Sequence, residues 1–344
     1  MAASGKGPTD RIGLKHGAGG RAMRALIEDV FLGLGGPVDG IGLSALDDGA
    51  AIRFGDQWIV ITTDSHVVQP IFFPGGDIGR LAICGTVNDL AMMGATEPLG
   101  LTCAVIIEEG FPREDLTRIR DSMKQACEEA GATIVTGDTK VMGKGEVDGI
   151  VINTAGVAVA RRVVSDAGLR VGDRIIVTGT IGDHGMAIMT RRRDLQIEGD
   201  LRSDVAPVNG LVRAALAAGG ADVVAMKDPT RGGLASSLHE MAGKAKVGIV
   251  LEEAMLPINP EVRAVGEILG IDPLVVANEG KAVIGVRAGS AEKVLAAIRA
   301  HPLGRRAAIV GTAIAERPGN LILDTGFGKR LIAEIEGEPL PRIC

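Results

Sequence analysis

Short apolar strands that run into glycine- and aspartate-rich loops recur along this chain. Residues 132–136 lead into Gly-Asp-Thr-Lys at 137–140, and residues 174–177 lead into a loop at 179–185 that contains three glycines. A further loop of this kind, at 228–233, precedes apolar residues with helical spacing. Glycine permits tight turns and close backbone approaches that other residues cannot make. Strands that alternate with such loops and with helices predict a mixed α/β fold.

The length of the chain predicts two domains. The sequence has 344 residues, of which 46% are apolar, and single hydrophobic cores stop growing at about 250–300 residues. A polar stretch at 161–172 is the expected crossing between the two units. We therefore expect a disordered N-terminus at 1–11, an N-terminal domain at 12–165, a C-terminal α/β domain at 166–335 and a flexible tail at 336–344.

Composition and charge argue against nucleic acid and membrane partners. The formal net charge is −6, and the chain has one Trp and no Tyr, whereas nucleic acids demand surplus Lys and Arg and bind aromatic side chains. The basic run at 191–193 is expected to be a solvated helix end. No stretch is apolar over the roughly 18 residues that a membrane span needs, and the N-terminus lacks the apolar core of a secretion signal.

The cysteines also favour the cytoplasm. None of the four forms a Cys-x-x-Cys pair, and in a reducing compartment Cys84, Cys103 and Cys127 are most simply small buried apolar residues. Cys344 is different, because it ends the segment Pro-Arg-Ile-Cys.

The segment that ends in Cys344 predicts an extended arm. A glycine at 337 and prolines at 339 and 341 disfavour a helix, and the eight residues from 337 onward can reach about 26–29 Å. Such an arm could carry a thiol from solvent into a cleft of its own protein. The alternative interpretation is a disordered end with an incidental cysteine.

Two aspartates are expected at the outer ends of a β-hairpin. Residues 51–54 and 58–62 have strand character around a turn at 55–57. A three-residue turn sets Asp48 directly opposite Asp64, and a two-residue turn makes the pair diagonal. Carboxylates that close together repel unless a cation lies between them, and their hard oxygens suit Mg²⁺. The alternative is a turn-capping Asp at each end.

The helix expected after this hairpin carries Asn88 and Asp89 among apolar residues. A bare carboxylate is costly to bury, so Asp89 either faces solvent or has a partner. A third oxygen ligand to the same metal would satisfy it.

Several loops have the composition of phosphate-binding sites. The segment from Lys15 to Gly20, with Gly19 next to Gly20, opens a helix pattern, and Arg231 lies in the loop at 228–233. Backbone N–H groups at a helix start and an arginine fork both bind phosphate. Lys140 could equally be solvated or bind a phosphate as a point charge, and each loop alone could be a plain structural turn. A further hairpin is expected at 275–286, with Glu279 at its exposed tip.

Taken together, these motifs resemble the aminoimidazole-ribonucleotide-synthetase (PurM-like) superfamily from about residue 12 to the end of the chain. The tail is similar to that of one family within it, the carbamoyl dehydratases of hydrogenase maturation. Selenophosphate synthetases share the ATP motifs but use a Cys or selenocysteine in the N-terminal loop, which has neither here. The residues that carry the resemblance are 15–20, 47–50, 63–64, 88–94, 136–140, 228–233 and 341–344.

The resemblance implies a two-domain PurM-like fold and a homodimer whose N-terminal domains share a β-barrel. ATP would lie between the two domains of each chain, with Mg²⁺ held by Asp48, Asp64 and Asp89. The loop at 15–20 would close over the phosphates. The nucleotide-binding residues implied in this way are Lys15, Gly19, Gly20, Asp48, Asp64, Asn88, Asp89, Gly137, Asp138 and Arg231.

The resemblance also implies an activity. A carbamoyl group on the Cys344 thiol would be dehydrated to a thiocyanate at the expense of ATP, which supplies cyanide ligands for the iron of NiFe hydrogenase. Glu279 would be the base and Lys140 would hold phosphate or the thiocarbamate oxygen, with His184 and His16 as further candidates. The implied partners are the carbamoyltransferase HypF and a HypC–HypD scaffold.

Two alternative functions remain open on the sequence alone. One is another ATP-dependent enzyme of the superfamily, of the selenophosphate synthetase, aminoimidazole ribonucleotide synthetase or thiamine-phosphate kinase type, which would have no use for Cys344. The other is a non-enzymatic scaffold that uses the tail as a docking peptide and does not turn over ATP.

Overall fold

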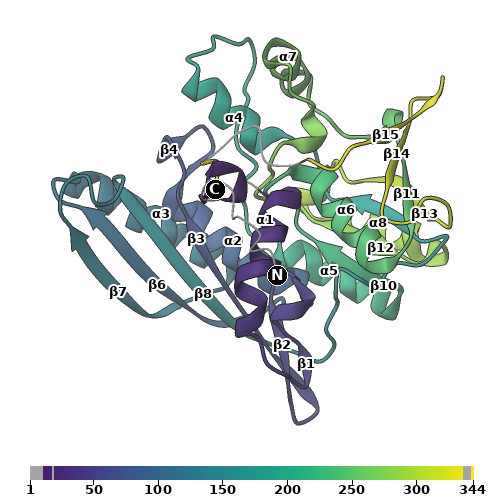
Figure 1. Cartoon of the computed structure of the whole chain (residues 1–344), viewed down its shortest axis with the longest axis horizontal. Helices are drawn as coiled ribbons and strands as arrows, with labels where there is room; N and C mark the ends of the chain where they lie inside the picture. The colour runs from purple at the N-terminus through teal and green to yellow at the C-terminus, as the bar shows by residue number, and fades with distance from the viewer. Residues whose placement is uncertain (1–10, 18, 336–341) are drawn as a thin grey trace, which may run out of the picture.

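The computed structural model describes residues 11–17, 19–335 and 342–344 and confirms the mixed α/β fold (Figure 1). Two β-sheets, each covered by helices, lie side by side, and the helix α1 (Gly20–Leu26) lies between them in the view. The segment from 161 to 173 connects the sheets, as the polar crossing predicts. Most of the expected N-terminal disorder and residues 336–341 of the tail fall outside the described residues.

The first sheet has six strands in the order β1-β2-β3-β8-β6-β7. All neighbours are antiparallel except β6 and β7, which are parallel and are joined by the crossover helix α3. The elements are β1 (Gly40–Ile41), β2 (Ala50–Phe54), β3 (Gln57–His66), α2 (Ile78–Met92), β6 (Pro98–Glu108), α3 (Arg113–Ala130), β7 (Ile134–Met142) and β8 (Ile150–Ala160). A small hairpin of β4 (Phe72–Phe73) and β5 (Gly76–Asp77) precedes α2.

The second sheet has seven strands in the order β10-β12-β9-β13-β11-β14-β15. Helices α5 and α8 pack on one face and α6 packs on the other. The strands are β9 (Arg174–Val177), β10 (Val223–Lys227), β11 (Gly248–Glu252), β12 (Val283–Val286), β13 (Ala308–Ile314), β14 (Leu321–Asp324) and β15 (Lys329–Ile332). The helices are α4 (Asp183–Arg192), α5 (Asn209–Gly219), α6 (Gly233–Ala245), α7 (Pro260–Leu269) and α8 (Ala291–Ala300).

Helix α2 is the central packing element of the first domain. Asp77 caps its N-terminus by accepting hydrogen bonds from the N–H groups of Gly79 and Arg80. Thirteen of its fifteen residues are buried, because one side packs on β3 and β8 while Ala91 and Met92 reach the core of the second domain. A helix that is apolar on all sides is stable only in such an enclosed position.

The register of the first hairpin follows the two-residue alternative. Phe54 pairs with Gln57 and Arg53 with Trp58, so the turn consists of Gly55 and Asp56, and the direct opposition of Asp48 and Asp64 is wrong. Asp48 lies before the start of β2, and extending this register would set it opposite Thr63, one residue before Asp64.

Two further expectations about local structure are wrong. Residues 137–140 do not form a turn, because β7 continues through them to Met142 and pairs with β6. A Cβ on Gly137 would lie 2.3 Å from the carbonyl oxygen of Cys103, so close strand pairing explains this glycine. Residues 275–286 do not form a hairpin either, since Val275 ends a 3-10 helix and Glu279 is 3% exposed.

One face of the first sheet is apolar yet solvent-exposed. Side chains on β3 and β8 alternate between buried and more exposed positions, and α2 covers the buried side. The open face carries Ile52, Phe54, Ile61 and Val157, each more than a third exposed. The strand register places Lys140 on this same face, beside Ile106.

Asn88 joins the two domains through buried hydrogen bonds. Its Nδ2 donates to the carbonyl oxygens of Ala206, at 3.1 Å, and Glu279, at 3.2 Å, and its Oδ1 accepts from the N–H of Val208 at 2.8 Å. Asn88 is 2% exposed, so these groups have little access to water.

We expect Asn88→Ala to lower the free energy of unfolding by about 3 kcal/mol, because it leaves buried backbone groups without partners. Urea denaturation followed by circular dichroism measures the change. Asn320→Ala, whose exposed side chain donates a local hydrogen bond to the carbonyl oxygen of Pro318, is the matched control. An unchanged denaturation midpoint for Asn88→Ala would contradict the assigned role.

Candidate active site

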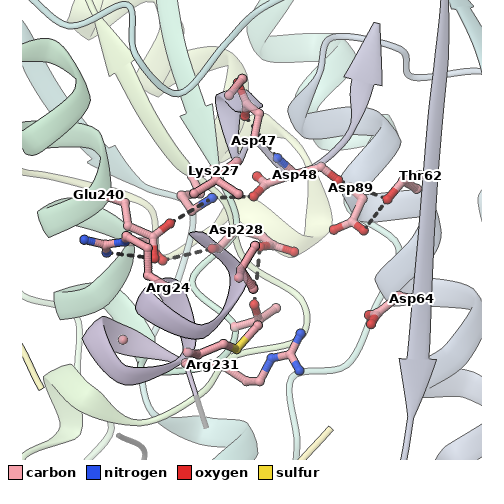
Figure 2. A pocket seen from close by; sticks show the side chains of 18 of the residues that line it. Arg24, Asp47, Asp48, Thr62, Asp64, Asp89, Lys227, Asp228, Arg231 and Glu240 are labelled. Carbon is pink, nitrogen blue, oxygen red and sulfur yellow. Dashed lines mark hydrogen bonds and ion pairs between the residues drawn. The ribbon is translucent and has the colours of Figure 1, made fainter. Parts of the chain in front are cut away.

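A cavity of about 580 Å³ lies between the two domains and gathers most of the expected site residues (Figure 2). Asp48, Asp64 and Asp89 come from the first domain and Arg231 from the second, as the sequence predicts. The described lining residues with polar chemistry include Asp47, Asp48, Thr62, Thr63, Asp64, Asp89, Lys227, Asp228, Thr230, Arg231, Glu240, Glu279 and Cys344.

The carboxyl groups in this cavity are buried and crowded, and both conditions disfavour their ionisation. Burial raises the pKa of Asp48 to about 8, and the nearby charges of Asp228 and Asp47 add to this against the opposing effect of Lys227. Burial also raises the pKa of Asp228 to about 6. The pKa of Asp89 is raised by burial and then by its acidic neighbours Asp228, Asp64 and Asp48. Additional positive charge would stabilise the ionised forms of these groups.

Lys227 supplies part of that positive charge from within the protein. Its Nζ lies 2.5 Å from Asp48 Oδ1, 3.3 Å from Glu240 Oε2 and 3.5 Å from Asp166 Oδ2. Burial disfavours the ammonium ion, but these carboxylates outweigh burial and raise the pKa of Lys227 well above its ordinary value. Figure 2 shows Lys227 between Asp48 and Glu240, and Arg24 lies on the side of Glu240 away from Lys227.

Asp64 differs from the other acids because it has a buried imidazole beside it. His66 Nε2 lies 3.1 Å from Asp64 Oδ2, and His66 is 1% exposed. Burial opposes ionisation of Asp64, but His66, Arg231 and the N–H of Ser65 together outweigh burial and lower the pKa of Asp64 to about 2. The ring fits because a Cβ on Gly85 would lie 2.8 Å from His66 Nε2. Asp64 is therefore a permanent negative charge in the cavity.

The acidic groups have the chemistry of Mg²⁺ ligands but do not form a closed cage. Within the described ranges, no three His, Cys, Asp or Glu side chains lie close enough together to hold a metal ion by themselves. Asp48 Oδ2 is buried and has no hydrogen-bond partner among the described atoms. Asp47, in contrast, accepts hydrogen bonds from the N–H groups of Asp48 and Asp166, so Asp48 is the better placed ligand.

The N-terminal glycine loop reaches the cavity, but Lys15 does not line it. Gly19 and Gly20 line the cavity at the start of α1, where a Cβ on Gly19 would lie 2.9 Å from Arg231 Cβ. Lys15 is exposed on a short 3-10 helix, and His16 forms a local turn with Gly13. The glycines rather than the lysine therefore border the candidate phosphate region.

Glu279 is a buried cavity residue. Its pKa is raised well above the ordinary value by burial and by the charges of Asp228, Asp64 and Asp204, with Arg231 opposing them. Its Oε1 has no hydrogen-bond partner among the described atoms. A buried carboxyl group with an unsatisfied oxygen and a perturbed pKa in a cavity is a candidate acid or base.

Residues 342–344, at the end of the tail, are docked against the rest of the protein. Ile343 is 1% exposed and belongs to a buried apolar cluster to which both domains contribute, and Cys344 lines the cavity together with Glu279. Arg192, expected to be solvated, donates hydrogen bonds to the carbonyl oxygens of Gln69 and Arg342. Cys84, Cys103 and Cys127 are buried, as expected, and burial raises their pKa values.

Besides Lys15, four further expected site residues lie outside the cavity of their own chain. Asn88 is buried at the domain junction, where its side chain bonds only to backbone groups in the described hydrogen bonds. Gly137, Asp138 and Lys140 lie exposed on β7, which Figure 1 shows at the outer edge of the first sheet. Their roles stay predictions.

Lys227, Asp228, Glu240 and His66 were not predicted as site residues. Asp228 opens the recognised loop at 228–233, and Lys227 stands directly before it at the end of a strand, which was the available signal for both. No local pattern marks Glu240 or His66, because their partners come from distant parts of the chain.

Comparison with known proteins agrees with this geometry. The family models for the N-terminal and C-terminal domains of AIR synthase related proteins match residues 46–160 and 170–324. The carbamoyl dehydratase HypE of Rhizobium leguminosarum bv. viciae is 50% identical over 338 residues, which cover 97% of this chain and 95% of that protein. The corresponding HypE of Escherichia coli K12 is 44% identical over 97% of this chain and 100% of that protein.

Solved structures of HypE proteins also match this chain. A crystal structure of a HypE–HypF complex contains a chain that matches with a TM-score of 0.84 and 45% identity over 90% of this chain and 100% of that chain. A HypE crystal structure in complex with ATP matches with a TM-score of 0.80 and 41% identity over 96% and 99% of the two chains. On this evidence, the chain belongs to the HypE family of carbamoyl dehydratases within the AIR synthase related proteins.

Proposed function

We infer that this chain is an ATP-dependent carbamoyl dehydratase that converts a carbamoyl group on Cys344 to a thiocyanate and so supplies cyanide for the iron of NiFe hydrogenase. The observation that carries this proposal is the position of Cys344, which lines the same cavity as Glu279 and the acidic cluster. A kinase or synthetase for a free small molecule would not require its own thiol there. ATP binding is supported by the related HypE structure in complex with ATP.

The chemistry requires that the carbamoyl oxygen leave. Hydroxide is a poor leaving group, so the oxygen attacks the γ-phosphorus of ATP, ADP leaves, and loss of one N–H proton gives an S-bound iminophosphate. Loss of the second N–H proton expels phosphate and leaves Cys-S-C≡N. The carbamoyl oxygen ends in phosphate, and both amide protons are released. Such a transfer gains most of its rate from positioned positive charge, which Arg231 contributes in this cavity.

Glu279 is the proposed proton acceptor. Its raised pKa makes its carboxylate a stronger base than an exposed glutamate, and its Oε1 is not engaged by another described group. Arg231 opposes the rise and favours the ionised form that a base needs.

Mg²⁺ is proposed at Asp48, Asp64 and Asp89. Mg²⁺ commonly binds through one or two carboxylates together with substrate phosphates, so the protein need not supply a closed cage. The unpartnered Asp48 Oδ2 and the raised pKa values of Asp48 and Asp89 fit a site that needs additional positive charge. When bound, Mg²⁺ would neutralise charge on the phosphates of ATP.

A homodimer formed through the open face of the first sheet is proposed as well. The apolar residues Ile52, Phe54, Ile61 and Val157 would be buried by a second copy that completes a barrel. Lys140 lies on that face, and Thr63, at an exposed position of β3 on the same face, also lines the cavity. Gly137, Asp138 and Lys140 are therefore proposed to act at the cavity of the partner subunit.

Partners and compartment follow from the same proposal. HypF is the proposed donor of the carbamoyl group, supported by the related HypE–HypF complex, and a HypC–HypD scaffold is the proposed cyanide acceptor. A carrier thiol needs a reducing compartment, and we propose the cytoplasm. Among the described residues, no helix is long and apolar enough to cross a membrane.

The first prediction concerns the carrier and the base. After incubation with HypF, carbamoyl phosphate and ATP, intact-protein mass spectrometry should show wild type gaining one carbamoyl group and then losing one water. Cys344→Ala should gain nothing, whereas Glu279→Gln should gain carbamoyl and lose water at least about 100-fold more slowly. Modification of Cys344→Ala at the wild-type level would refute the proposed function.

The second prediction concerns the metal. Asp48→Ala and Asp64→Ala should each reduce Mg²⁺-dependent ATP hydrolysis by about 100-fold or more without changing the melting temperature greatly, because both remove a ligand charge from the cavity. Asp56→Ala, in the exposed turn of the hairpin, is the matched control. Full activity in both variants would contradict the proposal that Asp48 and Asp64 bind Mg²⁺.

The third prediction concerns the dimer. Val157→Glu should convert the dimer to a monomer in sedimentation velocity, because it places a charge in the centre of the proposed apolar interface. Val171→Glu, at a more exposed valine outside the first sheet, should leave the dimer intact. A monomeric wild type would refute the interface.

Mixed dimers test the role of Lys140 directly. Lys140→Ala and Glu279→Gln should each be nearly inactive. If Lys140 acts in the cavity of the partner subunit, a random mixture of the two should recover about a quarter of wild-type activity, since half of the dimers then contain one intact site. No recovery would place Lys140 in its own chain's site or outside catalysis.

A further inference from the structure

The tail is held by its main chain. His184 Nε2 donates a hydrogen bond of 2.9 Å to the carbonyl oxygen of Ile343. The carbonyl oxygen of Arg342 accepts from the N–H of Gln69, at 3.2 Å, and from the side chain of Arg192. These bonds involve neighbouring peptide groups directly before Cys344, so they fix the direction in which the thiol leaves the tail.

His184 is a neutral imidazole that donates a hydrogen bond. It is fully buried, and burial lowers its pKa below the ordinary value. Because a carbonyl oxygen can only accept, Nε2 carries the proton and Nδ1 accepts from the hydroxyl of Ser203 at 2.7 Å. The imidazole also contacts the ring of Phe73. The two rings are nearly perpendicular with 5.4 Å between their centroids, and this contact further limits rotation of the imidazole.

The glycine loop around His184 is not available for a phosphate. The N–H of Gly182 donates to Asn278 Oδ1 at 2.7 Å, and the N–H of Gly185 donates to the carbonyl oxygen of Ala277 at 3.1 Å. These bonds attach the start of α4 to the segment that immediately precedes Glu279. His184 therefore holds the tail from an element that is rigidly connected to the proposed base.

The tail contacts both domains at this point. Gln69 belongs to the first domain, and His184 and Arg192 belong to α4 of the second. Ser203, which orients His184, also donates its backbone N–H to the carbonyl oxygen of Pro74 in the first domain at 2.8 Å. The docking position of the tail thus depends on the correct placement of the two domains.

We propose that His184 is a positioning residue that docks the tail through the Ile343 carbonyl group and thereby sets the place of the Cys344 thiol beside Glu279. The catalytic consequence of this docking rests on the proposed function, whereas the docking of the tail does not depend on it. The buried side chain of Ile343 supplies apolar contact, and the hydrogen bond from His184 selects one backbone register.

Two substitutions separate the tail contact from a general effect on folding. His184→Gln places an amide donor near the position of Nε2 and retains the bond to Ile343. His184→Asn is shorter, reaches only the position of Nδ1 and loses that bond while it can still pair with Ser203. Both remove the ring contact with Phe73, so this loss cancels in the comparison.

The readout is the rate at which Cys344 reacts with a maleimide attached to a large polyethylene glycol, which cannot enter a cavity of about 580 Å³. Cys344→Ala gives the background from the three buried cysteines. We expect His184→Asn to react about tenfold faster than wild type, because one hydrogen bond of the docked state is lost, and His184→Gln to stay within about threefold. Equal rates for the two variants, raised or unchanged, would overturn the proposal.

A second measurement links docking to catalysis. In single turnover of the carbamoylated protein, His184→Asn should lose water about tenfold more slowly than His184→Gln. If maleimide rates differ as expected but neither variant dehydrates, the docking inference holds and the proposed function fails. If dehydration is equal while maleimide rates differ, His184 docks the tail without positioning it for the reaction, and that half of the proposal is overturned.

Discussion

The crowding of carboxyl groups between the two domains is the constraint on which the site depends. Asp48, Asp89 and Asp228 are all buried in one cavity with raised pKa values, and a folded chain tolerates this only with compensating positive charge. Lys227 and Arg231 supply part of it from the second domain. Asp48 and Asp89 come from the first domain, whereas Asp228 and both cations come from the second, so part of the charge balance depends on contact between the domains.

The tail belongs to the same arrangement. Its last described residues lie where both domains meet, so a thiol that is distant from the cavity in sequence becomes part of its wall. Most of the described hydrogen bonds that hold the tail are accepted by main-chain carbonyl groups, which every residue possesses. Two side chains of the tail also contribute, since the Arg342 guanidinium pairs with Asp148 and the Ile343 side chain is buried in an apolar cluster to which both domains contribute.

Periodicity and composition predicted the elements well where local sequence decides the structure. The strand expected at 174–177 is β9, the strands expected at 51–54 and 58–62 lie within β2 and β3, and the three candidate metal ligands Asp48, Asp64 and Asp89 do line one cavity. The sequence could not predict that β7 runs through residues 137–140, because pairing with β6 outweighs the turn chemistry of Gly and Asp. The sequence also could not predict the burial of Glu279, because its hydrogen-bond partners Asn88 and Asp204 are distant from it in the sequence.

The hydrogen bond from Asn88 to the carbonyl oxygen of Glu279 has a consequence for inactivation. The peptide group of the proposed base is fixed by a side chain from the opposite domain, at 3.2 Å. A small rotation of one domain against the other would displace this peptide before it disturbed the hydrophobic core of either sheet. Heat or denaturant would then abolish turnover while both domains kept their secondary structure, so loss of activity would precede loss of fold.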